Sequence, residues 1–338
     1  MSEHNFGERR GRPSRELLYE RLDLQIAELW QRLGGLPRPI DAHDIWRGLW
    51  YEEAHHSTAI EGNTLVLKQV EALLEQGRAV GNKELAEYLE VKGYADAADW
   101  VYNQASRPTM TSDRDIVTLA ELRQIHRMAM TPVWDVTPHP QATEREQPGS
   151  FREHDIQPFP GGMTPPSWPL VPVEMDTWLA NANAIETRAE PFAERIADLH
   201  ATFERIHPFL DGNGRTGRLV LNLVLVRLGY PPVIIYKRNR SKYLAALRRA
   251  DDGDRGALGE LLARSILDNL YRFVVPAVAG PARLVPLAAL ANDEISAAAL
   301  RTAANRGRLQ AIRGPDAEWR SSRNWVDEYL ASRYKRGR

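Results

Sequence analysis

The chain of 338 residues contains no cysteine, which excludes disulfide bonds, thiolate nucleophiles and zinc sites built on cysteine. It also lacks a long apolar run. Residues 219–228 form the most apolar stretch, but they include Asn222 and Arg227 and are too few to span a bilayer. Residues 1–15 are polar and rich in arginine, so no signal peptide is predicted. These absences lead us to expect a cytoplasmic protein with no membrane partner.

Net charge is almost absent as well, because 44 lysines and arginines stand against 45 aspartates and glutamates, for a formal charge of -1. The whole chain therefore gives no electrostatic argument for nucleic acid binding. The distribution is uneven, since residues 301–338 hold 10 basic and 4 acidic side chains. A Gly-x-x-x-x-Gly-Lys phosphate loop is also missing, so the sequence gives no support for an ordinary ATPase.

What is present is helical periodicity, in a composition with 43% hydrophobic residues that can build a sizeable core. Apolar residues recur every three or four positions between residues 17 and 33, until Gly34 and Gly35 end the pattern. Similar patterns predict a mainly α fold, with helices over residues 45–58, 65–76, 83–105, 116–130, 173–187, 191–205, 214–228, 241–250 and 257–273. Ten prolines interrupt this order within residues 131–172. There only edge strands or an irregular hairpin are expected.

The length allows two or three lobes, and the pattern predicts three. Residues 1–112 form an N-terminal helical lobe, residues 113–280 a central domain and residues 281–338 a C-terminal module, with a boundary at Gly280-Pro281. In the module, helices are expected over residues 296–305 and 324–332. Strands over residues 309–313 and 318–321 flank a Gly-Pro-Asp turn.

The segment around residue 213 predicts an anion site at the start of a helix. Gly212 and Gly214 let the backbone approach a ligand closely, and Asn213 between them tolerates the dihedral angles of a tight turn. The first N–H groups of the helix over residues 214–228 have no partner within the helix, and they carry the positive end of its dipole. This geometry suits a phosphate group.

Four charged or titratable side chains flank this turn. Arg215 and Arg218 share a face of the first helical turn and can fork onto phosphate oxygens. Asp211 offers a hard oxygen ligand for a divalent ion, and His207 an imidazole that titrates near neutral pH. Each feature alone is more often structural. Their combination within 12 positions favours a phosphate-handling active site.

The run from residue 207 to residue 218 resembles the signature of the Fic domain. It reads His-Pro-Phe, any residue, an acid, Gly-Asn-Gly-Arg, two residues and Arg, which matches the signature at every defining position. The resemblance covers residues 116–252 and extends more weakly over the N-terminal lobe. It implies a Fic-type helical core with a β-hairpin flap. It also implies transfer of AMP from ATP to a tyrosine, threonine or serine hydroxyl of a target protein, although some relatives transfer phosphate, UMP or phosphocholine.

The resemblance also implies roles for the residues of the motif. His207 would be the general base, and Asp211 would hold Mg²⁺ between the α- and β-phosphates of ATP. The implied phosphate-binding residues are Gly212, Asn213, Gly214, Arg215, Thr216, Gly217 and Arg218. Downstream, Tyr243 either lines the adenine pocket or belongs to the core of an amphipathic helix.

A second motif lies in the N-terminal lobe. Residues 57–63, Ser-Thr-Ala-Ile-Glu-Gly-Asn, match the inhibitory pattern of the Fic class whose inhibitory helix precedes the domain. A Glu61 carboxylate paired with Arg218 would withdraw this arginine from the γ-phosphate. The alternative is an ordinary helix end with Gly62 as its left-handed cap. A further expectation is the reverse reaction, removal of AMP from a modified target, with Glu61 positioning water.

Residues 149–172 resemble the flap of the family, a hairpin that receives the target segment by main-chain pairing. Its expected contact residues are Ile156, Gln157 and Pro158, although the prolines weaken the case for regular strands. A connection without function is the alternative.

The C-terminal module resembles a small helix-turn-helix or winged module of the excisionase type. Its basic residues can contact nucleic acid phosphates, dock a protein target or form a solvated surface. Two functions therefore stay open. The chain is either an autoinhibited protein adenylyltransferase or a DNA-binding regulator whose Fic core senses a nucleotide. Family members also often pair, so a homodimer is possible.

Overall fold

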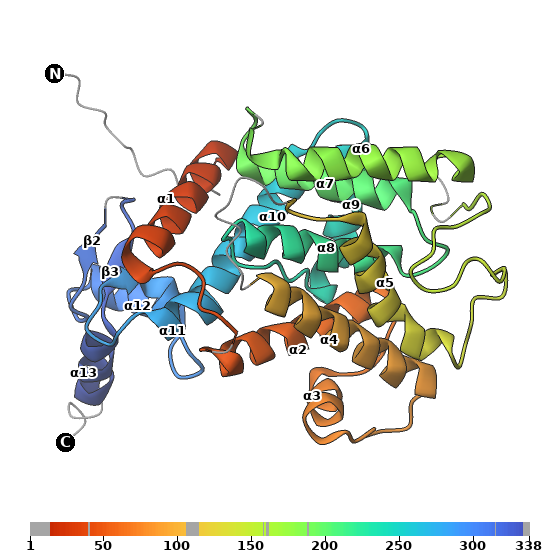
Figure 1. The fold of residues 1–338 in the computed structure, drawn as a ribbon. Helices are drawn as coiled ribbons and strands as arrows, with labels where there is room; N and C mark the ends of the chain where they lie inside the picture. Colours follow the sequence, from red (N-terminus) through yellow and green to blue (C-terminus); the bar gives the residue numbers. More distant parts are fainter. Residues whose placement is uncertain are drawn as a thin grey trace.

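The computed structural model describes residues 14–39, 41–105, 115–157, 159, 162–187, 189–314 and 316–333. Helices dominate this part of the chain, and the strands gather in one small sheet at the C-terminal end (Figure 1). Among the described residues, no helix is both long enough and apolar enough to cross a membrane.

The N-terminal lobe begins with a helix whose two ends were predictable. The Ser14 hydroxyl accepts the Leu17 N–H at 3.3 Å, and Gly34 ends the helix in the left-handed conformation with φ 83°. The helices of this lobe are α1 (Arg15–Leu33), α2 (His43–Glu61), α3 (Leu67–Gln76) and α4 (Leu85–Ala105). Each lies within a few residues of its predicted range.

The central domain packs its helices around α8, which is buried along nearly all of its length. Its helices are α5 (Leu119–Trp134), α6 (Val171–Asn183), α7 (Phe192–Ile206), α8 (Asn213–Arg227), α9 (Arg240–Asp251) and α10 (Gly256–Asn269), followed by a π-helical turn (Leu270–Val274) and α11 (Val275–Val278). Three short 3₁₀ turns, η1 (Trp168–Leu170), η2 (Ile185–Thr187) and η3 (Lys237–Asn239), connect them. The apolar run noted in the sequence is therefore the central helix of the core.

The N-terminal lobe and the central domain share this core, because α8 contacts α2 and α4 as well as α5 and α7. A buried carboxylate marks the junction. Glu53 of α2 accepts hydrogen bonds from Tyr94 of α4 at 2.7 Å and from Asn222 of α8 at 2.8 Å. Desolvation raises the pKa of Glu53 to about 7, against these hydrogen bonds, which lower it. The polar network ties the second helix of the chain to the middle of the fold.

The C-terminal module contains a small antiparallel sheet with the strand order β1-β3-β2. Its elements are β1 (Val285–Pro286), the 3₁₀ turn η5 (Leu287–Leu290), α12 (Ala297–Asn305), β2 (Ile312–Arg313), β3 (Trp319–Ser321) and α13 (Arg323–Arg333). The predicted hairpin of β2 and β3 and both helices are confirmed, whereas β1 was not predicted. The module contacts α1 through Arg21, which bonds Glu318 at 3.1 Å, and through Gln25, which bonds Asp316 at 3.1 Å.

The flap segment differs from the expected hairpin. The described residues of 149–167 form no strand. The physical reason is that prolines remove the N–H donors that a strand ladder requires. The segment is instead fixed by buried Arg152, whose guanidinium donates to the carbonyl of His207 at 2.9 Å and to that of Pro166 at 2.6 Å. One side chain thus ties the flap segment to the turn that follows α7.

Candidate active site

The turn after α7 presents His207 toward the site. This residue ends α7 in the left-handed conformation, with φ 50°, which is unusual for a residue other than glycine. Its Nδ1 lies 3.0 Å from the carbonyl oxygen of Glu204. Because a carbonyl can only accept, Nδ1 carries the proton and Nε2 keeps its lone pair. Desolvation lowers the pKa of His207 to about 4, so the imidazole is neutral at pH 7 and can accept a proton.

Asn213 holds the loop that follows this histidine. Its side-chain oxygen accepts the Phe209 N–H at 2.8 Å, and its side-chain nitrogen donates to the Phe209 carbonyl at 2.8 Å. The Phe209 ring stacks on His126 with ring centroids 3.7 Å apart. His126 in turn donates from Nε2 to the Asp211 carbonyl at 2.9 Å. The Asn213 side chain is therefore engaged in shaping the loop, which leaves its backbone N–H for a phosphate.

The open end of α8 is occupied by a carboxylate. Gly212 caps the helix with φ 77°, and no acidic residue lies in the first turn of α8 itself. Glu61, at the end of α2, fills this position. A Cβ on Gly214 would lie only 2.5 Å from its Oε1. Glycine at this position is thus required for the close approach. The unpaired N–H groups and the helix dipole favour a negative charge at this position.

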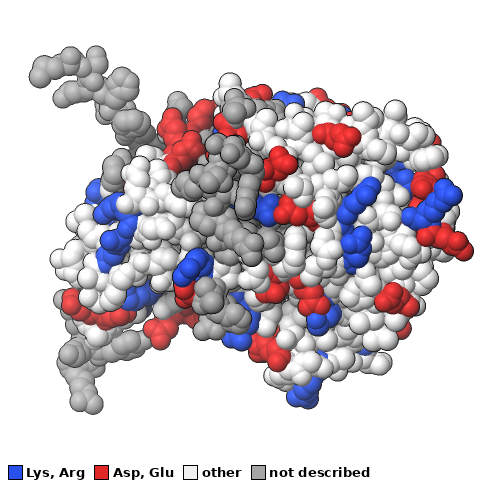
Figure 2. Space-filling view, viewed as in Figure 1, with Lys and Arg blue, Asp and Glu red and all other residues white. Residues whose placement is uncertain are grey.

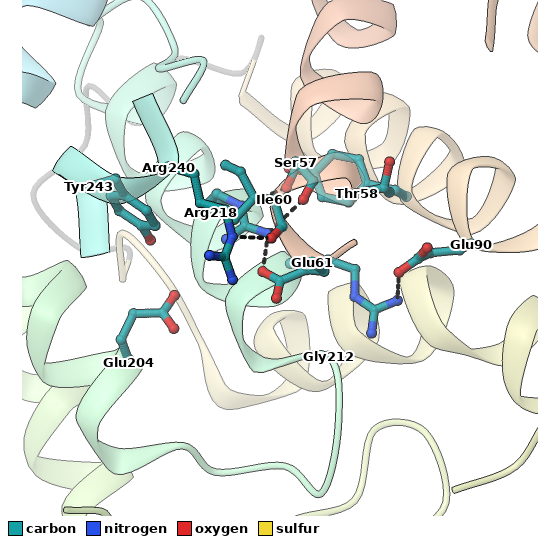
Figure 3. A network of polar contacts seen from close by, with 12 residues as sticks. Ser57, Thr58, Ile60, Glu61, Glu90, Glu204, Gly212, Arg218, Arg240 and Tyr243 are labelled. Carbon is teal, nitrogen blue, oxygen red and sulfur yellow. Dashed lines mark hydrogen bonds and ion pairs between the residues drawn. The ribbon is translucent and has the colours of Figure 1, made fainter. Parts of the chain in front are cut away.

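Glu61 also pairs with Arg218, as the sequence led us to expect (Figure 3). Arg218 donates from Nη2 to Glu61 Oε1 at 2.7 Å, from Nε to the Ser57 hydroxyl at 2.6 Å and from Nη2 to the Ser57 carbonyl at 3.0 Å. Desolvation alone would raise the pKa of Glu61, but the Arg218 guanidinium outweighs it and lowers this pKa. Arg240 donates to the Ile60 carbonyl at 2.7 Å, so two arginines hold the C-terminal end of α2.

The second motif arginine has carboxylate partners of its own. Arg215 donates from Nη1 to Glu90 of α4 at 2.6 Å and from Nη2 to Asp211 at 3.1 Å. The Asp211 side chain is 46% exposed. Desolvation raises the pKa of Asp211, but Arg215 and the Gly212 N–H outweigh this and hold the pKa below its usual range. Asp211 is therefore ionised at pH 7.

Asp211 fits the requirements of a magnesium ligand. Its Oδ1 accepts the Gly212 N–H at 2.6 Å as well as Arg215, and its Oδ2 bonds no other described residue. Mg²⁺ is commonly held by one or two carboxylates together with substrate phosphates and water. The described residues hold no cluster of three or more metal-ligating side chains. The donor set therefore fits an ion that arrives with a phosphate ligand.

Other predicted site residues are placed away from the open end of α8. Thr216 is fully buried, and Gly217 packs against α7, where a Cβ would lie 2.4 Å from the carboxylate of Glu204. The side of α8 that carries them faces the core, and their contact with phosphate stays a prediction. Tyr243 is 1% exposed, and its hydroxyl lies 2.7 Å from Nε2 of His200. It lies in the core beside Arg218, and a role in adenine binding stays a prediction.

The flap residues lie on both sides of the described boundary. Ile156 is partly buried, Gln157 is exposed and Pro158 lies outside the described residues. Phe159 packs edge-on against His207, with ring centroids 5.0 Å apart. The segment thus contacts the histidine, and the role of its residues in target binding stays a prediction.

Three residues near the arginines were not assigned a role from the sequence. Glu90 and Ser57 bond the arginines directly, and Glu204 of α7 faces Arg218 across the site (Figure 3). Glu204 is 4% exposed, and its Oε1 has no hydrogen-bond partner among the described residues. Desolvation raises the pKa of Glu204 to about 7, although Arg218 opposes this rise. For Glu204, its place three residues before His207 was the only available signal.

A neutral histidine, an ionised acid and two arginines lie together at a helix N-terminus, an arrangement that suits a phosphate ligand. Residues 116–225 match the sequence profile of the Fic/DOC family. Residues 116–225 of this chain are therefore a Fic domain.

Relatives of known sequence and structure agree with this assignment. The chain is 34% identical over 208 residues to the protein adenylyltransferase Fic of Aedes aegypti, a match that covers 61% of this chain and 38% of the mosquito protein. Fic-1 of C. elegans superposes with a TM-score of 0.61 at 27% identity, covering 78% of this chain and 71% of that chain. A Fic-domain signaling protein of Bacteroides thetaiotaomicron superposes with a TM-score of 0.59 at 25% identity, covering 77% of this chain and 96% of that chain.

Proposed function

We propose that this chain is a protein adenylyltransferase that transfers AMP from ATP to a tyrosine, threonine or serine hydroxyl of a target protein, and that Glu61 inhibits it. The position of Glu61 is the observation that carries this proposal. Its carboxylate lies on the N-terminus of α8, above Gly214, and pairs with Arg218 at 2.7 Å. An anionic side chain in the place suited to a phosphate is what an internal competitor of ATP requires.

The neutral His207 supplies the base for the transfer. Nε2 takes the proton of the target hydroxyl as the hydroxyl oxygen attacks the α-phosphorus of ATP. The bond from the α-phosphorus to the bridging oxygen breaks, and pyrophosphate leaves with that electron pair. The backbone N–H groups at the start of α8 stabilise charge on the α-phosphate. Positioning and electrostatics therefore account for most of the catalysis.

The charged residues of α8 act on the rest of the triphosphate. Arg215 and Arg218 hold the β- and γ-phosphates, and Arg218 can do so only after it parts from Glu61. Asp211 is the residue that would hold Mg²⁺, which neutralises part of the triphosphate charge when bound. In the reverse reaction, Glu61 would orient water toward an AMP–protein bond.

Labelled ATP tests the transfer and its inhibition together. We expect Glu61→Gly to raise self-modification, or modification of an added target, roughly 10- to 100-fold, the range of typical couplings between sites. Adding His207→Ala to this variant should lower the rate by about 10²- to 10⁴-fold, because the general base is lost.

The matched control is Glu52→Gln on the same helix, since Glu52 pairs with Arg272 away from the site. It should transfer AMP at the wild-type rate. Equal transfer by the wild type and Glu61→Gly would contradict the inhibition. No transfer by Glu61→Gly with any target or nucleotide would contradict the activity.

A second candidate function is nucleic acid binding by the C-terminal module. Figure 2 shows basic side chains on the side of the molecule where this module lies in Figure 1. Exposed side chains of the module include Arg301, Arg306, Arg308 and Arg313. Glu318 and Asp316 instead face α1 and its polar residues, where they pair with Arg21 and Gln25. These two acids of the module thus face inward, and the exposed arginines stay available to an external anion.

A further inference from the structure

Arg215 is held from the N-terminal lobe by a residue far away in the sequence. Glu90 of α4 lies 125 positions before it and accepts its Nη1 at 2.6 Å (Figure 3). The Arg215 side chain is only 7% exposed and that of Glu90 16%. The pair is therefore largely removed from water, so salt screens it less than it screens an exposed ion pair.

The opposite edge of Arg215 is open to another partner. Nη2 reaches Asp211 at 3.1 Å, and Nε is buried without a hydrogen-bond partner among the described residues. A buried N–H donor is costly unless an acceptor satisfies it. Nε and Nη2 form the edge of a guanidinium that commonly binds two oxygens of one anion. This edge is thus suited to a phosphate once Asp211 turns to other ligands.

Glu90 is itself fixed in place. Its Oε2 accepts a hydrogen bond from Asn63 at 2.8 Å, and the same amide donates to the Glu87 carbonyl at 2.9 Å. Asn63 is 4% exposed and lies two residues after Glu61. The helix that carries Glu90 packs on α2, α5 and α8. Glu90 can therefore keep its contact with Arg215 while the site changes its occupant.

We propose that Glu90 is a positioning residue, which holds Nη1 of Arg215 so that the Nε–Nη2 edge faces the triphosphate. Asn63 bonds Glu90 and lies two residues after Glu61. The end of α2 and the residues that follow it therefore contact Arg218 directly and Arg215 through Glu90. The inference rests on the proposed function of the site. It differs from a second inhibitory role, in which Glu90 would compete with phosphate for Arg215 and its removal would raise activity.

The test compares Glu90→Gln with its matched control, Glu87→Gln. Both residues lie on α4 and contact the 63–64 segment, but Glu87 bonds Thr64 and does not touch Arg215. Calorimetry with ATP and Mg²⁺ in a His207→Ala background measures affinity without turnover. We expect Glu90→Gln to weaken ATP binding about 3- to 10-fold and Glu87→Gln to leave it within twofold. In the Glu61→Gly background, Glu90→Gln should also lower the rate constant of transfer.

A double-mutant cycle separates positioning from a structural role. Glu90→Gln should add little to the loss of ATP affinity caused by Arg215→Ala, because Glu90 acts through that arginine. Additive losses, or tighter ATP binding by Glu90→Gln, would overturn the proposal. If Glu61→Gly transfers no AMP, the proposed function fails, and the affinity cycle still decides the role of Glu90.

Discussion

The arginines of α8 and those of the C-terminal module stand in opposite environments. The side chains of Arg215 and Arg218 are 7% and 5% exposed, and each is bonded to a carboxylate. Arg301, Arg306 and Arg308 are exposed and pair with no acidic side chain in the described part of the module. The same residue type is thus desolvated and oriented in one region and hydrated in the other. Orientation before binding suits catalysis, whereas hydrated charges suit a partner that approaches from solvent.

Removal of one arginine from each region should give the largest difference between them. Arg218→Ala leaves Glu61 and Ser57 without their buried cation, so we expect the free energy of unfolding to fall by about 3 to 5 kcal/mol. Arg308→Ala should change it by no more than about 0.5 kcal/mol, as for other surface substitutions. Urea unfolding followed by circular dichroism measures both.

A double variant tests whether the unpaired Glu61 carboxylate causes the loss of stability in Arg218→Ala. Because Glu61 would no longer need a partner, Arg218→Ala with Glu61→Gln should regain part of the lost stability. Equal losses for Arg218→Ala and Arg308→Ala would contradict the difference between the two regions.

The sequence predicted helix ends better than it predicted contacts between distant residues. Helix ends could be predicted because residues close in sequence determine them, as Ser14 and Gly34 do at the two ends of α1. The contact of Glu61 with Arg218 could be predicted only because two motifs in the sequence resemble those of one family. The role of Glu90 could not be predicted, because its contact with Arg215 spans 125 positions and leaves no local pattern.

The flap and Tyr243 show a different limit. A proline-rich segment and a tyrosine on an amphipathic helix have more than one stable arrangement, and only the packing of distant elements decides between them. In the structure, Arg152 hydrogen-bonds the His207 carbonyl and so fixes the flap segment to that turn. The Tyr243 hydroxyl hydrogen-bonds His200. Neither partner lies near its residue in sequence.

The pH dependence of the free energy of unfolding should also differ between the two regions, by a smaller amount. Desolvation raises the pKa of Glu204 from 4.5 to about 7, while Glu61 adds to the rise and Arg218 opposes it. A raised pKa means that the folded chain binds this proton more tightly, so its contribution to stability is full below pH 4.5 and is lost as the pH rises through 7. Relative to Glu204→Gln, the wild type should lose at most about 3 kcal/mol between these limits.

Chemical unfolding at a series of pH values measures this difference. The control is Glu294→Gln in the C-terminal module, where the side chain is exposed. This variant should follow the wild type within about 0.5 kcal/mol at every pH. A wild type that gains stability relative to Glu204→Gln as the pH rises would show that Glu204 is ionised and paired in the folded chain.

The smallest effect concerns the hydrated arginines themselves. If the C-terminal module binds duplex DNA, each arginine that contacts a phosphate releases counterions, so the logarithm of affinity falls with the logarithm of salt concentration. Arg308→Gln should reduce this slope by about 1 and weaken binding similarly for unrelated sequences, since a phosphate contact reads no base. Fluorescence anisotropy of a labelled duplex at several salt concentrations measures the slope. Arg218→Gln should leave it unchanged, because that side chain is buried at the other site. The absence of binding at low salt would exclude nucleic acid as the partner and leave a protein target or a solvated surface as the alternatives.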